Sequence, residues 1–96
     1  MIQTALTHYG TEAQILQTVE ECAELQQALL HHIRNRPADV VSEIADVEIM
    51  CASMRIVFGS GLVDQAKAHK LARLAERVAI EQAKPPKTQM QILEGC

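Results

Sequence analysis

Residues 38–58 read ADVVSEIADVEIMCASMRIVF, and this stretch decides the fold. At about 100° per residue on a helical wheel, it has one broad apolar arc made of Val40, Ile44, Val47, Met50, Cys51, Met54 and Phe58. The opposite side is apolar as well and contains Val41, Ala45, Ile49, Ala52 and Ile56. A helix that is apolar nearly all round should be central, and in so short a chain it predicts that another subunit covers one side.

The sequence before this stretch predicts another long helix. Thr11-Glu12-Ala13-Gln14 has the pattern of a capping box with Thr11 as N-cap, and the helix that it opens extends to about Ile33. Gly10 separates this helix from a short one within residues 1–9. We expect its core stripe to consist of Leu16, Val19, Ala23, Leu29, Leu30 and Ile33.

The sequence after the central stretch predicts a third long helix, which is charged. Gly59-Ser60-Gly61 ends the central helix, the third helix begins at Leu62, and Pro85-Pro86 stop it near Lys84. The expected fold is all-α: an antiparallel bundle of three long helices plus a short N-terminal helix, completed by oligomerisation to a dimer or tetramer. Residues 1–84 are expected to form a single domain, and residues 85–96 a C-terminal tail.

Composition and charge exclude several classes of protein. Among 96 residues, 48% are apolar but the only aromatic ones are Tyr9 and Phe58, which indicates an aliphatic core typical of a helix bundle. A net charge of −3 argues against binding to a nucleic-acid polymer. No run reaches the roughly 18 consecutive apolar residues of a membrane span, and the N-terminus lacks a signal-peptide pattern. We therefore expect a cytoplasmic protein with no membrane partner.

Two carboxylate pairs, Glu21-x-x-Glu24 and Glu43-x-x-Asp46, are separated by 18 residues. An i,i+3 step places both members of a pair on one helix face, so an antiparallel hairpin would bring the four acids together. At an effective dielectric near 20, each pair of charges roughly 5 Å apart repels by about 3 kcal/mol. Glu43 also lies inside the apolar arc, where an ionised carboxylate is unfavourable unless it is paired or bound to a cation. The acids therefore predict a divalent cation, and oxygen-only ligands indicate Mg²⁺, with Mn²⁺ as a substitute.

The third helix carries a basic set that matches these acids in charge. Lys70, Arg73 and Arg77 form a cationic stripe, and Lys67 falls within the neighbouring apolar arc. In one interpretation these residues pair with the acids or extend into solvent. In the other, they bind the anionic oxygens of a phosphate chain that the metal holds.

These residues resemble the MazG-like all-α nucleoside triphosphate pyrophosphohydrolases from about Tyr9 to Val78. The pattern of that family is E-E-x-x-E, a spacer of roughly 12 to 28 residues, and E-x-x-D; here it reads Glu20-Glu21-Cys22-Ala23-Glu24 and Glu43-Ile44-Ala45-Asp46. Members with a fuller basic motif carry N-x-K-F-x-R-R on the last helix. This chain has Ala68-His69-Lys70-Leu71-Ala72-Arg73-Leu74 there, without the Asn and the second Arg.

The resemblance implies Mg²⁺-dependent hydrolysis of a nucleoside triphosphate between its α- and β-phosphates, which gives the monophosphate and pyrophosphate. It implies that the metal ligands are Glu21, Glu24, Glu43 and Asp46, and that Glu20 orients a ligand or the attacking water. Lys70 and Arg73 carry over as phosphate contacts, with Lys67 and Arg77 as weaker candidates. We further expect the base near Gln14 and Gln17 and a role in nucleotide-pool house-cleaning.

Two other classes of function stay open. One is a non-catalytic helical oligomer that binds nucleotide or a protein partner, which the missing Asn and Arg suggest. The other is a purely structural oligomer, whose stability would be indifferent to Mg²⁺. Turnover and binding of nucleotide triphosphates would distinguish the three hypotheses.

Overall fold

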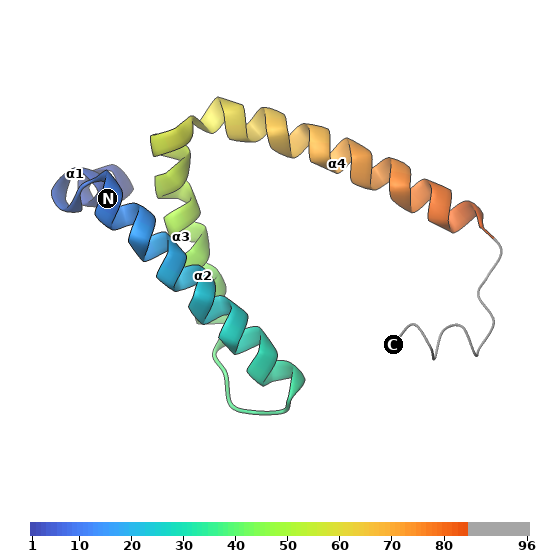
Figure 1. Ribbon diagram of the computed structural model, residues 1–96, viewed down its shortest axis with the longest axis horizontal. Helices are drawn as coiled ribbons and strands as arrows, with labels where there is room; N and C mark the ends of the chain where they lie inside the picture. The colour runs from blue at the N-terminus through green and yellow to red at the C-terminus, as the bar shows by residue number, and fades with distance from the viewer. Residues whose placement is uncertain (85–96) are drawn as a thin grey trace. The chain divides into compact units, whose positions relative to one another are not determined.

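The described part of the chain, residues 1–84, is all-α in the computed structural model (Figure 1). Its four helices are α1 (Ile2–Tyr9), α2 (Thr11–Ile33), α3 (Val40–Phe58) and α4 (Ser60–Ala83). The expected helices are therefore confirmed, with their ends shifted by a residue or two. The expected tail, residues 85–96, lies outside the described residues.

The chain divides into two compact units, Met1–Val63 and Asp64–Cys96. In the first unit, α2 and α3 pack along each other as a helical hairpin, and α1 contacts both of them (Figure 1). The second unit contains most of α4. Across residues 1–84, no helix is both long enough and apolar enough to span a membrane. The expectation of a single domain stays a prediction.

Two glycines with positive φ separate neighbouring helices. Gly10 has φ 91° and Gly59 has φ 107°, a backbone conformation that residues with a Cβ atom rarely adopt. Each still closes the last turn before it, because Gly10 N–H donates to the Leu6 carbonyl and Gly59 N–H to the Arg55 carbonyl, both at 2.9 Å. The helix therefore breaks at a single residue, and Ser60 already belongs to α4.

The start of α2 differs from the predicted capping box, and this prediction was wrong. Thr11 is the first helical residue, and the N-cap is Gly10, which makes no side-chain capping hydrogen bond. Gln14, the expected partner in the box, is only 9% exposed. The Gly10 carbonyl accepts the first helical hydrogen bond, from Gln14 N–H at 3.1 Å, so Gly10 occupies the N-cap position and Thr11 is already helical.

The buried face of α2 also differs from the predicted core stripe. Leu16, Val19 and Ile33 are 58%, 61% and 74% exposed. The buried residues of α2 are instead Gln14 and Ala28. These two residues share one helix face with Glu21, because the three are spaced seven residues apart. The most apolar stripe of α2 therefore stays exposed, and a face that carries polar side chains packs in the hairpin.

The core within residues 1–84 is small. Five side chains are buried: Leu6, Gln14, Ala28, Met50 and Ser53. All of them lie on α1, α2 or α3, which contact one another in pairs. Within residues 1–84 the second apolar side of α3 is not covered, since Val41 and Ile49 are 79% and 54% exposed.

Candidate metal centre

The hairpin brings the four predicted metal ligands together. Glu21 and Glu24 come from α2, and Glu43 and Asp46 come from the first two turns of α3. One carboxylate oxygen of each residue lies within 4.8 Å of those of the other three. The α3 pair is held at this position because α3 begins with a cap, in which Ser42 N–H donates to Asp39 Oδ1 at 3.1 Å.

Two oxygens of this cluster are buried without a protein partner. Glu21 Oε2 and Glu43 Oε2 are inaccessible to solvent and accept no hydrogen bond within the described residues. A buried carboxylate oxygen that lacks both water and a donor is strongly unfavourable. The wheel position of Glu43, inside the apolar arc, therefore corresponds to a carboxylate that is partly withdrawn from solvent.

The charges of the cluster act on Glu24. The negative charge of Glu21 is the largest cause that raises the pKa of Glu24, followed by desolvation, a side-chain hydrogen bond with Glu21, and the charges of Glu43 and Asp46. Glu24 is itself exposed, so the repulsion from its neighbours dominates over burial. Without a cation, Glu24 therefore keeps its proton to a higher pH than an isolated glutamate does.

Gln17 connects this cluster to the preceding turn of α2. Its Nε2 donates to Glu21 Oε1 at 2.9 Å, an i,i+4 contact that fixes the Glu21 side chain. With Oε1 held by Gln17, Oε2 of Glu21 is the oxygen left without a partner. Sequence reasoning placed Gln17 near the base; the contact with Glu21 was not foreseen, although the i,i+4 spacing was visible.

A hollow of about 200 Å³ opens beside the cluster, between the end of α2 and the start of α3. It provides room for a ligand that touches two of the acids. Sequence reasoning did not single out His31 and Asp39 there. The residues that line it are Glu24, Gln27, Ala28, His31, Ala38, Asp39 and Glu43.

The predicted residues outside the four-acid cluster have different surroundings. Glu20, which was predicted to orient a ligand or the attacking water, is exposed on α2 and does not belong to the cluster. Gln14 and Gln17, the predicted base contacts, line a second hollow of about 380 Å³ together with Tyr9 and Ala13.

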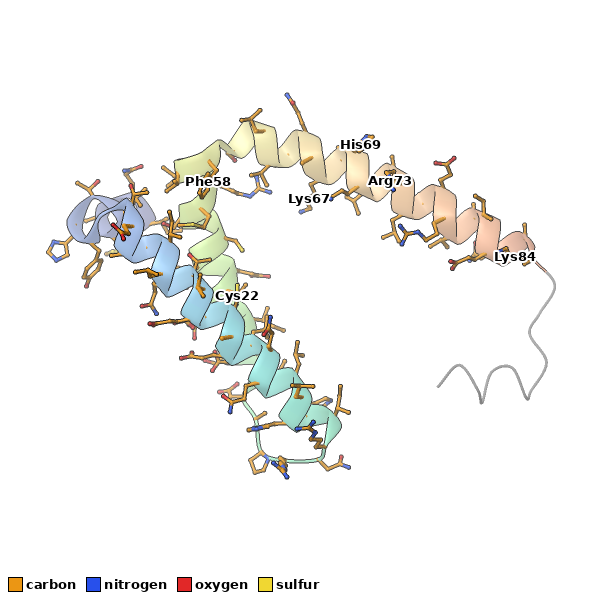
Figure 2. The ribbon with its side chains drawn as sticks, in the orientation of Figure 1. Cys22, Phe58, Lys67, His69, Arg73 and Lys84 are labelled. Atoms are coloured by element: carbon orange, nitrogen blue, oxygen red, sulfur yellow. The ribbon has the colours of Figure 1, made fainter. Side chains whose placement is uncertain are left out.

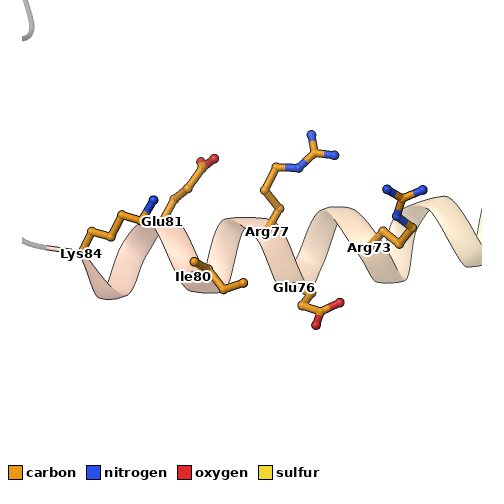
Figure 3. A pocket seen from close by; sticks show the side chains of 6 residues that line it. All are labelled: Arg73, Glu76, Arg77, Ile80, Glu81 and Lys84. Atoms are coloured by element: carbon orange, nitrogen blue, oxygen red, sulfur yellow. The ribbon is translucent and has the colours of Figure 1, made fainter.

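The predicted phosphate-binding residues lie on α4. Lys67, Lys70, Arg73 and Arg77 are all exposed, and Figure 2 shows Lys67 and Arg73 along this helix. Arg73 and Arg77 border a hollow of about 250 Å³, to which Lys84 adds a third basic side chain (Figure 3). Lys84 follows the last residue of α4, Ala83, and the sequence predicted it only as the end of the helix.

No family model, curated protein or solved structure matches this chain.

Proposed function

We propose that this protein is a Mg²⁺-dependent nucleoside triphosphate pyrophosphohydrolase, as its resemblance to the MazG-like enzymes implies. The observation that carries the proposal is the convergence of Glu21, Glu24, Glu43 and Asp46, with oxygens within 4.8 Å of one another. The reaction would take a nucleoside triphosphate and water to the monophosphate and pyrophosphate.

The donor set fits a magnesium ion. Oxygens on opposite sides of an octahedral Mg²⁺ lie about 4.2 Å apart, because each Mg–O distance is about 2.1 Å. Oxygens within 4.8 Å of one another need only small side-chain movements to reach that spacing. The buried, unpartnered oxygens of Glu21 and Glu43 support the fit, since a cation would satisfy both of them. Mn²⁺ has similar ligand preferences and would substitute.

The residues of the chain would divide the work of phosphoryl transfer. When bound, Mg²⁺ supplies neutralisation of phosphate charge and a lower pKa for water. Glu21 would act both as a ligand and in catalysis, and Glu20 would orient a ligand or the attacking water. Phosphate oxygens would be held by the basic side chains of α4, which are Lys67, Lys70, Arg73 and Arg77.

The base of the nucleotide would lie near Gln14 and Gln17, one or two turns before the acids of α2. Hydrolysis of unwanted triphosphates in the cytoplasm, as nucleotide-pool house-cleaning, is the role that we propose for this activity.

Homo-oligomerisation is part of the proposal. Leu16, Val19 and Ile33 form an exposed apolar row on α2, and Val41 and Ile49 are exposed on α3. A second copy would cover such surfaces and complete an antiparallel bundle in a dimer or tetramer. Leu16→Asp should then lower the mass measured by sedimentation velocity. If wild type and the variant both have the mass of a monomer, the proposed oligomerisation is contradicted.

Pyrophosphate release tests the activity. The purified protein should release pyrophosphate from a panel of nucleoside triphosphates with Mg²⁺ and not with EDTA. Glu43→Gln should lower kcat by about 100-fold or more, because it removes one ligand and its charge. Glu48→Gln is the matched control, since Glu48 is an exposed acid on the same helix and outside the cluster. Equal turnover by Glu43→Gln and Glu48→Gln would contradict the proposed metal-dependent mechanism.

One specific observation favours a second candidate, a non-catalytic oligomer that binds nucleotide or a protein partner. Ala68 and Leu74 stand where the fuller basic motif has Asn and Arg. Binding of a nonhydrolysable triphosphate with Mg²⁺ in calorimetry, without turnover of any nucleotide in the panel, would support this candidate over the enzyme.

A further inference from the structure

The hollow between α1 and the first turns of α2 has walls suited to a flat, neutral ring. Its volume is about 380 Å³, and its lining residues are Tyr9, Ala13, Gln14 and Gln17. Since none of these side chains is charged, the hollow offers no counter-charge to a phosphate or a metal. It offers an aromatic ring, a methyl group and two carboxamides.

Tyr9 has ring surface available for stacking. It is 64% exposed, and its ring meets that of His8 in a T-shaped contact with centroids 4.7 Å apart. Aromatic side chains stack on any nucleobase, because every base has a π face. In a chain without tryptophan and with one tyrosine, this side chain is also a unique spectroscopic reporter.

The two carboxamides add hydrogen-bonding groups at the edge of such a ring. Gln14 is only 9% exposed, and it lines the hollow. A carboxamide has a donor and an acceptor side by side, the pattern that complements the edges of nucleobases. Because Gln14 is nearly buried, its orientation is restricted before a ligand arrives.

Gln17 links this hollow to the acid cluster. It lines the hollow, and its Nε2 also donates to Glu21 Oε1 at 2.9 Å. Along α2, Glu21 lies about 6 Å beyond Gln17 and about 10 Å beyond Gln14. This offset suits a nucleotide that places its base in the hollow and its phosphates at the acids.

We propose that Tyr9 is a substrate-binding residue that stacks on the nucleobase, and that Gln17 couples this base pocket to the metal ligand Glu21. The proposal rests on the proposed function for the identity of the ligand. It adds the aromatic wall of the pocket, a direct contact for the base, and a positioning role for Gln17.

The test uses the full chain labelled with 3-fluorotyrosine, which places one ¹⁹F nucleus at Tyr9. The probes are a nucleoside triphosphate with a methylene group between its α- and β-phosphates, and inorganic tripolyphosphate, each with Mg²⁺. We expect the ¹⁹F resonance to shift with the nucleotide analogue and not with tripolyphosphate, because only the analogue has a ring to stack.

Variants measure the contribution of each wall. Tyr9→Ala should weaken binding of the nucleotide analogue by about tenfold in calorimetry, the loss expected for one stacked base. Tyr9→Phe should retain the wild-type affinity, because it keeps the ring. Binding of Mn²⁺ can be followed by electron paramagnetic resonance. Gln17→Met should weaken this binding by about 10-fold or more, whereas Gln26→Met should not, because Gln26 is exposed.

The outcomes separate this inference from the proposed function. If the analogue binds but neither shifts the ¹⁹F resonance nor responds to Tyr9→Ala, the base pocket is overturned and the enzyme proposal stands. If Gln17→Met and Gln26→Met bind Mn²⁺ equally, the coupling through Glu21 is overturned. If wild-type protein binds neither Mn²⁺ nor the analogue, both proposals fall together.

Discussion

Replacing Glu43 with glutamine should stabilise the protein without metal and destabilise it relative to wild type with metal. Glu43→Gln keeps the size of the side chain and removes one negative charge. An oxygen of Glu43 lies within 4.8 Å of oxygens of Glu21 and Asp46. At an effective dielectric near 20, one such pair of charges repels by about 3 kcal/mol. All three side chains are only half-buried, so solvent screening reduces the total.

We therefore expect the variant in EDTA to gain about 1–3 kcal/mol in the free energy of unfolding. In a domain of this size, each kcal/mol raises Tm by about 4–8 °C. With Mg²⁺ at 1,000 times its dissociation constant, wild type gains about 4.1 kcal/mol, and the variant gains far less because it lacks one ligand. The order of stability of the two proteins should thus reverse between EDTA and Mg²⁺.

Thermal unfolding followed by far-UV circular dichroism measures this reversal, at one protein concentration so that self-association contributes equally. Glu48→Gln again serves as the control, because the exposed Glu48 lies outside the cluster and its loss should change stability by less than about 0.5 kcal/mol. A Glu43→Gln protein that is less stable than wild type in EDTA would refute the reasoning, since repulsion would then not dominate at Glu43.

Two further predictions concern the same helices. Because the pKa of Glu24 is raised, the folded state keeps a proton on this side chain at pH values where the unfolded chain has released it. The contribution of Glu24 to stability is therefore complete below the ordinary pKa of 4.5, and it is lost as the pH rises through the raised pKa. In EDTA, Glu24→Gln should therefore match wild type in Tm near pH 4 and exceed it increasingly toward pH 7; a difference that shrinks with rising pH would contradict this sign. Asp39→Ala removes the acceptor for Ser42 N–H and should lower the free energy of unfolding, measured by urea titration, by about 1 kcal/mol. Asp39→Asn keeps an acceptor oxygen and should retain most of the wild-type stability.

The pairing of acids on one helix face could be predicted from the sequence because it depends on local periodicity. The i,i+3 spacing places Glu43 and Asp46 on one face, and the apolar arc around Glu43 already indicated that this carboxylate leaves the solvent. Those two features need no knowledge of the partner helix. The all-α fold and the approximate helix limits followed from the same periodicity together with glycine and proline.

The packing face of α2 could not be predicted in the same way. Hydrophobicity alone favours Leu16 and Val19 as core residues. It cannot distinguish the face of α2 that packs on α3 from a face that stays exposed in the described part of the chain. The face of α2 that packs in the hairpin contains Gln14, a polar residue that a hydrophobic pattern does not assign to the core. The predicted capping box was wrong for a separate reason, because Gly10, and not Thr11, occupies the N-cap position and accepts the hydrogen bond from Gln14 N–H.

The small core of α1, α2 and α3 has a calorimetric consequence. Heat capacity rises on unfolding in proportion to the apolar surface newly exposed to water, by about 12–15 cal/mol/K per residue in ordinary globular domains. Helices whose apolar side chains are already half-hydrated in the folded chain have little more to expose. An isolated copy should show a heat-capacity increment per residue well below this range, and dilution of an assembled form should move the increment toward that lower value.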